Sequence, residues 1–208
     1  MEELAPWLPE VFDESSDWAT VEPLGDLKVI VFGGVPGSGK TTLAEGLGAE
    51  LGIHVASLDW ILGAFTQYGA FRLADATGLA YELALREGLR ELLCGRSVIL
   101  DGIARQLDVG VQDAVLVRWR SLADARKASF FATDCVCSDE ALHHSRMSGR
   151  TRGVPGWKQT VAWEHVERTR ANRRPWTFEH LLVDSVDSAE ANLEKVLTFV
   201  SSAEQRSG

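Results

Sequence analysis

Nine consecutive residues near the start of the chain have the types and spacing needed to hold phosphate groups. Directly after an apolar run at 29–32, they read Gly34-Val35-Pro36-Gly37-Ser38-Gly39-Lys40-Thr41-Thr42. Glycines let a backbone curl so that successive N–H groups point at phosphate oxygens, and a helix that starts near Lys40 adds the positive end of its dipole. The first eight residues fit G-x-x-x-x-G-K-[ST] after a strand, which is a phosphate-binding loop, or P-loop. We therefore expect residues 34–42 to bind the phosphates of ATP.

Two side chains of this loop have separate tasks. The Lys40 ammonium would reach the β- and γ-phosphates, and the Thr41 hydroxyl would bind Mg²⁺. We expect Lys40 to be partly exposed while the loop is empty. The structural alternative is a glycine turn with a solvated lysine, and the strand before the loop and the helix after it argue against that alternative.

Two carboxylates lie at the ends of apolar runs. Asp101 ends Val98-Ile99-Leu100-Asp101, where an acid can hold Mg²⁺ directly or through water, or can cap the next turn. Asp59 follows a second strand and could accept the proton of an attacking hydroxyl. A helix N-cap is the structural alternative for Asp59. We expect Asp101 and Thr41 at the metal, and Asp59 as the catalytic base.

Arginines gather after the fourth predicted strand. Arg146 and Arg150 are four residues apart near a predicted helix end, so they share one face. Phosphoryl transfer spreads negative charge over the transferred group, and arginines on a mobile segment can neutralise that charge while excluding water. The glycines and proline at 151–156 fit a hinged lid at about 146–172. The alternative is an ordinary solvated basic face.

Two further residues could contact a substrate. Trp60 follows Asp59 and could form an apolar wall of a small-molecule pocket, although a position in the core is the commoner fate of such a side chain. Arg105, four residues after Asp101, could grip an anionic or polyhydroxyl substrate, or lie at the surface. The neighbours His143 and His144 face different ways on a helix, so we expect exposed or locally bonded histidines rather than a metal pair.

Short β-branched runs alternate with helical patterns from residue 28 onward. The predicted strands are 28–32, 54–58, 97–100, 129–136 and 181–183, and the predicted helices are 41–51, 75–94, 111–127, 139–148, 157–171 and 189–200. This alternation predicts a parallel sheet covered on both faces, with ligands bound beyond the carboxyl ends of the strands. The candidate residues all lie near such ends.

Bulk properties limit the class of protein. A chain of 208 residues fits one domain, which we place at 27–208 after an acidic N-terminal arm at 1–26. The net charge of −9 argues against a general nucleic-acid binder, although a basic stretch at 146–174 keeps nucleic acid open. No apolar run approaches the ~20 residues that span a bilayer. Three cysteines without metal-site spacing and an acidic start fit a cytoplasmic protein.

Together these residues resemble the small P-loop kinases, the family that includes chloramphenicol phosphotransferase, and the wider group of zeta-toxin-like, adenylate-kinase-like and AAA-type ATPases. The resemblance rests on the segments 34–41, 57–62 and 98–102 and on the two spaced arginines. It implies an α/β P-loop NTPase fold, with three α/β/α layers, a five-stranded parallel sheet in the order 2-3-1-4-5 and a short helical lid. It also implies that Asp59 activates the substrate hydroxyl and that Arg146 and Arg150 are lid arginines.

The sequence predicts an ATP- and Mg²⁺-dependent phosphotransferase that moves the γ-phosphate to a hydroxyl of a small molecule, such as an antibiotic or other natural product. Its expected partners are ATP and this acceptor, without a membrane. Two alternatives stay open. One is a nucleoside, nucleotide or polynucleotide-end kinase, which the basic stretch favours. The other is a non-catalytic ATP-binding module that regulates a partner through the acidic arm.

Overall fold

The structure is a computed structural model, and it describes most of the chain. The described residues are 21–23, 25–68, 73–104, 109–148, 153–155, 161–172, 176 and 178–202. Two predicted site residues, Arg105 and Arg150, lie outside them, as does most of the predicted arm. Within the described part of that arm, the Val21 N–H donates to the Leu93 carbonyl oxygen, 3.1 Å away. The end of the arm therefore lies against the last turn of a long helix.

Five parallel strands form the central sheet, in the order β2-β3-β1-β4-β5. Their bounds are β1 (Lys28–Gly34), β2 (His54–Ser57), β3 (Val98–Ala104), β4 (Ser129–Val136) and β5 (Leu181–Asp184). The predicted strand order is confirmed. Because β1 lies in the middle, the loop that follows it emerges at the centre of the sheet's carboxyl edge, where ligands bind in open parallel sheets.

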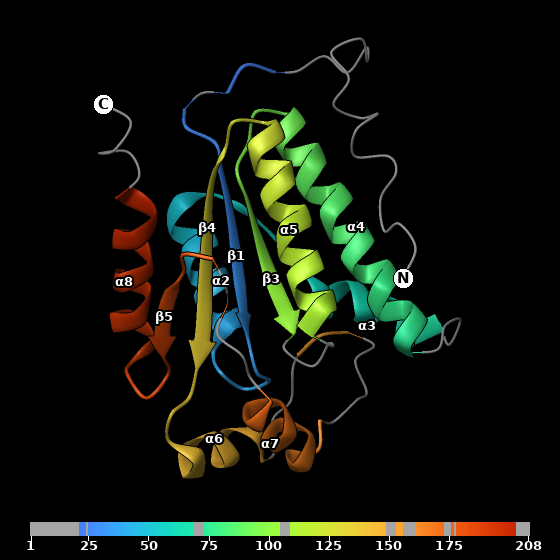
Figure 1. Cartoon of the computed structure of the whole chain (residues 1–208), viewed down its shortest axis with the longest axis vertical. Helices are drawn as coiled ribbons and strands as arrows, with labels where there is room; N and C mark the ends of the chain where they lie inside the picture. Colours follow the sequence, from blue (N-terminus) through green and yellow to red (C-terminus); the bar gives the residue numbers. More distant parts are fainter. Residues whose placement is uncertain are drawn as a thin grey trace.

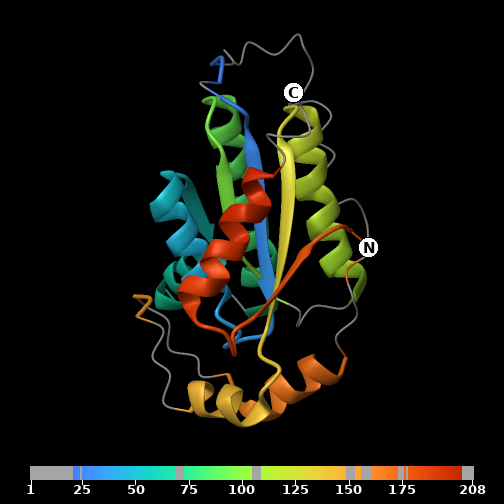
Figure 2. The ribbon, with the colours of Figure 1, turned by 90° about the vertical axis from the view of Figure 1, so that its left-hand side faces the viewer.

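Helices cover both faces of the sheet and its carboxyl edge (Figure 1). One face carries α2 (Lys40–Leu51) and α8 (Ala189–Ser201), and the other carries α3 (Leu58–Tyr68), α4 (Leu73–Leu93) and α5 (Val109–Ala125). Two short helices, α6 (Glu140–Met147) and α7 (Trp163–Ala171), lie beyond the carboxyl ends of the strands in both views (Figure 2). In the described ranges, every helix is too short or too polar to cross a bilayer.

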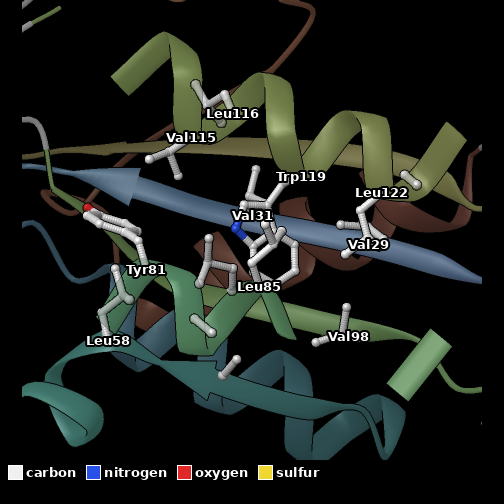
Figure 3. Packing of buried hydrophobic residues seen from close by; sticks show 14 of the residues in the cluster. Val29, Val31, Leu58, Tyr81, Leu85, Val98, Val115, Leu116, Trp119 and Leu122 are labelled. Carbon is white, nitrogen blue, oxygen red and sulfur yellow. The ribbon is translucent and has the colours of Figure 1, made fainter. Parts of the chain in front are cut away.

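The side chains of β1 divide between two apolar clusters because successive residues of a strand point to opposite faces. Val29 and Val31 join the cluster under α4 and α5, around the buried Trp119 (Figure 3). Ile30 and Phe32 join the cluster under α2 and α8. A central parallel strand buried on both faces explains the uninterrupted apolar run before the loop. Each such buried side chain contributes about 1.5–3 kcal/mol, which fixes the base of the loop.

Two elements differ from the sequence predictions near the second strand and the lid. The predicted strand 54–58 ends at Ser57, and the unpredicted helix α3 begins at Leu58. Leu58, Leu62 and Phe65 recur at helical spacing and pack on the first cluster, and this contact stabilises the helix. The predicted helix 157–171 begins only at Trp163, after a non-helical Ala162.

The third strand is longer than predicted, and this changes the setting of Asp101. We expected the strand to end at Leu100, but β3 continues to Ala104. Asp101 therefore lies within β3, opposite Phe32 of β1. The register shifts between Phe32 and Gly33, with Gly102 as the extra residue of β3. Such a bulge bends a strand and redirects side chains beside it.

Two glycines of α4 allow a test of the packing between α4 and α5. A Cβ on Gly88 would lie 2.6 Å from two ring carbons of the buried Trp119, whereas a Cβ on Gly78 would meet nothing within 4 Å. We expect Gly88→Ala to lower the melting temperature, because overpacking costs about 1–3 kcal/mol and exceeds the gain in helix propensity of about 1 kcal/mol. Gly78→Ala should raise it. Thermal melts check both, and a stabilised Gly88→Ala would contradict this packing.

Candidate active site

The residues after β1 form a tight loop that leads into the N-terminus of α2. Gly34 ends β1, and a Cβ there would lie 2.3 Å from the Cys135 carbonyl oxygen of β4, so no larger residue fits. Gly39 precedes α2 with φ 85°, a left-handed conformation that favours glycine. Lys40 is the first residue of the helix. The loop therefore has the strand–loop–helix geometry that phosphate binding requires.

Three of the predicted site residues lie near a fourth, Asp101. Its side chain is 2% exposed, and the Ser57 hydroxyl donates to Asp101 Oδ2 at 3.3 Å. Burial raises the pKa of Asp101 above its ordinary value, the Lys40 ammonium and the Thr41 hydroxyl partly offset this rise, and the Asp59 carboxylate adds to it. These influences require proximity. The structure thus gathers Lys40, Thr41 and Asp59 about one buried acid.

The second oxygen of Asp101 fits a metal site. Across the part of the chain that the structure describes, no group donates a hydrogen bond to the buried Asp101 Oδ1. Leaving a buried carboxylate oxygen without a partner is costly. A hard cation such as Mg²⁺ takes carboxylate and hydroxyl oxygens as ligands and would favour the charged form of the acid. Asp101, with the nearby Thr41 hydroxyl, therefore has the chemistry of the predicted metal site.

Lys40 differs from the sequence expectation in its exposure. We expected it to be partly exposed, but it is 7% exposed. Its charge lowers the pKa of both Asp101 of β3 and the buried Cys135 of β4, so the ammonium lies near these two strands. The negative charge of the nearby Asp101 offsets part of the cost of burying the ammonium.

A pocket of about 300 Å³ adjoins the loop on the side of α8. It is lined by residues of the phosphate loop, α2, α6, the β5–α8 connection and α8. These residues are Gly37, Gly39, Thr42, Leu43, Arg146, Ser185, Asp187, Ala189 and Asn192. Arg146 Nη1 donates to the Ser185 hydroxyl at 2.9 Å and so joins α6 to that connection. Arg146 therefore lies beside the phosphate loop, and its contact with a transferred phosphate stays a prediction.

The structure separates two neighbouring residues that the sequence assigned to one substrate site. Asp59 lies in the first turn of α3 rather than at its N-cap, where the helix dipole favours a carboxylate. Trp60 is 53% exposed and lines a different hollow of about 420 Å³, together with His54 and Glu87. Adjacent helical residues point about 100° apart, which explains the separation.

The lid lies against α3 as well as the loop. A Cβ on Gly63 of α3 would lie 2.7 Å from the Pro155 carbonyl oxygen, so the segment 153–155 packs closely on this helix. The lid therefore contacts the helix that carries Asp59.

Several residues of this region escaped the sequence analysis. Ser185, Asp187 and Asn192 line the pocket, and their place after the fifth strand is a signal that could have found them. His143 was expected to be exposed or locally bonded, and this was wrong: it is fully buried, and its ring is bonded to the loop at the Pro36 carbonyl oxygen. No pattern in the sequence indicates that contact, because it joins residues 107 positions apart.

Comparison with known proteins agrees with this architecture. A family model described as an AAA domain, AAA_33, matches residues 29–176. Among curated proteins, no match was found.

Solved structures of small kinases have a similar fold. A kinase candidate from Chloroflexus aurantiacus J-10-fl has a TM-score of 0.62 at 18% identity, with 84% of this chain and 98% of that chain covered. A gluconokinase from Sinorhizobium meliloti 1021 has a TM-score of 0.59 at 14% identity, with coverage of 89% and 97%. A shikimate kinase from Acinetobacter baumannii, in complex with shikimate, gives 0.54 at 16%, with coverage of 85% and 94%. The resemblance inferred from the sequence is confirmed for the fold.

The metal assignment predicts a selective effect of Asp101→Asn. This change keeps the acceptor for Ser57 but removes the charge, so affinity for ATP with Mg²⁺ should fall roughly 10–100-fold. Affinity for ATP in the presence of EDTA should change little. Calorimetric titrations under both conditions measure the difference, with Glu45→Gln, an exposed carboxylate of α2, as the charge-matched control. Equal losses under both conditions would show a structural role instead.

Proposed function

This chain belongs to the AAA domain family, and from this membership and the site geometry we propose that it is an ATP-dependent kinase. It transfers the γ-phosphate of ATP to a hydroxyl of a small molecule. The observation that carries the proposal is the convergence of Lys40, Thr41 and Asp59 on the buried Asp101, beside a helix N-terminus. A phosphoryl acceptor reaction needs this set of a cation, a metal-binding acid and a second carboxylate.

Each residue has a distinct role in this proposal. The loop amides and Lys40 hold the phosphates, while Thr41 and Asp101 hold Mg²⁺, which when bound neutralises charge that develops on the phosphate oxygens. Asp59 orients the acceptor hydroxyl and accepts its proton as the oxygen attacks phosphorus. Arg146 and Arg150 neutralise the transferring group. Proximity supports Arg146, and the four-residue spacing alone supports Arg150, which lies outside the described residues.

The pocket on the side of α8 suits the nucleoside of ATP, and the side of α3 suits the acceptor. Thr42 and Leu43 connect the pocket directly to the phosphate loop. Asp59 belongs to α3, which covers the opposite face of the sheet from α8. Two ligands that enter from opposite sides can meet in line at the loop, which is the geometry of direct phosphoryl transfer.

The acceptor is proposed as a class rather than as a compound. A small molecule with a hydroxyl group accords with the names of the kinases that share the fold, gluconokinase and shikimate kinase. An antibiotic acceptor rests only on the sequence resemblance to chloramphenicol phosphotransferase. Trp60 and Arg105 stay predictions as acceptor contacts. The division into an arm at 1–26 and a catalytic domain at 27–208 with a lid at 146–172 stays a prediction. A cytoplasmic location stays a prediction as well.

A screen with labelled ATP tests the function and its alternatives. The protein is incubated with sugars, hydroxy acids, antibiotics, nucleosides and oligonucleotides with free 5′ ends. Label in a small non-nucleoside product supports the proposal, and label only in nucleosides or oligonucleotide ends supports the nucleic-acid kinase. Tight ATP binding without any labelled product would support a non-catalytic module. Against the nucleic-acid reading, Arg170 of the basic stretch is bonded to a buried histidine.

The first prediction from this mechanism concerns Lys40→Ala. Loss of the ammonium should reduce phosphoryl transfer on the order of 10²-fold or more, because a preorganised charge at the phosphates is removed. The fold should survive, since Asp101 can take up a proton when its cationic neighbour is gone. Turnover and thermal melts check this, with Lys127→Ala, an exposed lysine in the turn before β4, as control. Near-normal turnover would contradict the assignment of the phosphate loop.

The second prediction concerns Asp59→Asn, which keeps the size of the side chain but removes the proton acceptor. Stability and ATP affinity should change little, while transfer falls on the order of 10²–10⁴-fold, the usual contribution of a positioned general base. Asp124→Asn, an exposed acid on α5, is the matched control. A parallel loss of stability and activity would indicate a structural role, and unchanged turnover would move the base to another residue.

A further inference from the structure

His143 joins helices α6 and α7 to the phosphate loop. It lies on α6 with a fully buried side chain, and its Nε2 is 2.7 Å from the Pro36 carbonyl oxygen. Its other ring nitrogen, Nδ1, is 3.1 Å from Arg170 Nη1 of α7. The Trp163 ring packs against the imidazole in a T-shaped arrangement, with ring centres 5.3 Å apart. A buried histidine that bridges a lid and a loop has no role in the chemistry assigned above.

The chemistry of its two partners fixes the protonation of this imidazole. A carbonyl oxygen only accepts hydrogen bonds, so Nε2 must carry the proton toward Pro36. A guanidinium group only donates, so Nδ1 must present its lone pair toward Arg170. His143 is therefore the neutral Nε2–H tautomer. Without Arg170 the other tautomer becomes available, and it would direct a lone pair at the Pro36 oxygen.

The accepting carbonyl belongs to the central peptide of a tight turn. The Ser38 N–H donates to the Val35 carbonyl oxygen at 3.2 Å, which closes a four-residue turn. Pro36 is its second residue, and Gly37, its third, has φ 83°. Proline followed by a residue of positive φ is the signature of a type II turn. Types I and II differ by a flip of the central peptide, here the bond between Pro36 and Gly37.

Such a flip would exchange donor and acceptor at the loop. In a planar trans peptide the carbonyl oxygen and the following N–H point in opposite directions. With the Pro36 oxygen turned toward His143, the Gly37 N–H points away from His143, and Gly37 also lines the 300 Å³ pocket. In the flipped turn, the Pro36 oxygen would take the place of that N–H and repel a phosphate oxygen.

We propose that His143 is a positioning residue that holds the Pro36–Gly37 peptide in its phosphate-binding orientation, and that Arg170 of the lid selects the tautomer that does so. This inference rests on the proposed function, since it assumes that nucleotide phosphates bind at the loop. The close packing of Gly37 adds to it: a Cβ there would lie 2.6 Å from Met147 Sδ and 3.0 Å from His143 Nε2. Helices α6 and α7 thus support the turn from outside.

Two substitutions of His143 separate positioning from packing. Gln carries an amide nitrogen that can reach the place of Nε2 and donate to Pro36, whereas Asn can only reproduce an acceptor near Nδ1. We expect the Kd for ATP to rise by at least tenfold in His143→Asn and by less than about threefold in His143→Gln, because only Asn leaves the carbonyl without its donor. Melting temperatures should fall similarly in both. Equal Kd values for the two variants would overturn the proposal.

The role of Arg170 has its own matched pair on α7. Arg170→Met removes the donor to Nδ1, whereas Arg168→Met changes an exposed arginine of the same helix. Nitrogen-detected NMR of labelled histidines should give the Nε2–H tautomer in the wild type and in Arg168→Met. In Arg170→Met we expect a mixture of tautomers and weaker ATP binding. The Nδ1–H form in the wild type would overturn the proposal, and this readout needs no destabilising change at His143.

The design also separates this inference from the proposed function. If the wild type binds ATP but transfers phosphate to no acceptor, the kinase proposal fails while the His143 comparison still stands. If the wild type transfers phosphate and both His143 variants bind ATP equally well, the positioning role fails and the kinase proposal stands. Binding of inorganic tripolyphosphate in place of ATP should show the same difference between the variants, because the turn acts on phosphates rather than on the base.

Discussion

A loop that turns its N–H groups toward a phosphate must satisfy its carbonyl groups elsewhere. Each peptide has a donor and an acceptor on opposite edges, and buried backbone groups without partners are costly. Here the Val35 carbonyl oxygen accepts a hydrogen bond within the turn, and the Pro36 carbonyl oxygen is bonded to the His143 side chain of α6. The binding geometry of the loop therefore depends on residues more than 100 positions away, which provide the partners that the loop cannot provide for itself.

In the rest of the fold, apolar packing stabilises the sheet, whereas buried charge at its carboxyl edge lowers stability. Apolar clusters on both faces of β1 hold the base of the loop, together with the pairing of β1 with β3 and β4. At the carboxyl edge the chain instead buries Asp101 beside Lys40, and burial raises the pKa of that acid. Burying these charged groups lowers the stability of the fold. It is useful for a binding site, because the groups are already in position when a cation or phosphate binds. Such local conflicts are expected at functional sites.

Sequence reasoning succeeded where one short segment determines the outcome. The loop at 34–41 and the alternation of strands and helices depend on local spacing, whereas the strand order came from the family resemblance. Sequence reasoning failed where a contact between distant elements determines the local structure. The helix α3 forms because Leu58 and Leu62 pack on the first cluster, and β3 extends past Asp101 because β1 pairs with it across a bulge. Neither the burial of Lys40 nor the contact of His143 with Pro36 has a local signal.

The number of arginines in the basic stretch does not reveal what each of them contacts. From the sequence, arginines near 146–174 indicate either contacts with phosphate or a solvated face. Arg146 borders the pocket beside the loop and also bonds to Ser185, whereas Arg170 bonds to a buried imidazole. Arg146 thus connects α6 to the residues after β5, and Arg170 connects α7 to α6, each through its own hydrogen bond. His143 in turn bonds to the Pro36 carbonyl oxygen, so a chain of hydrogen bonds runs from α7 through α6 to the turn at 35–38.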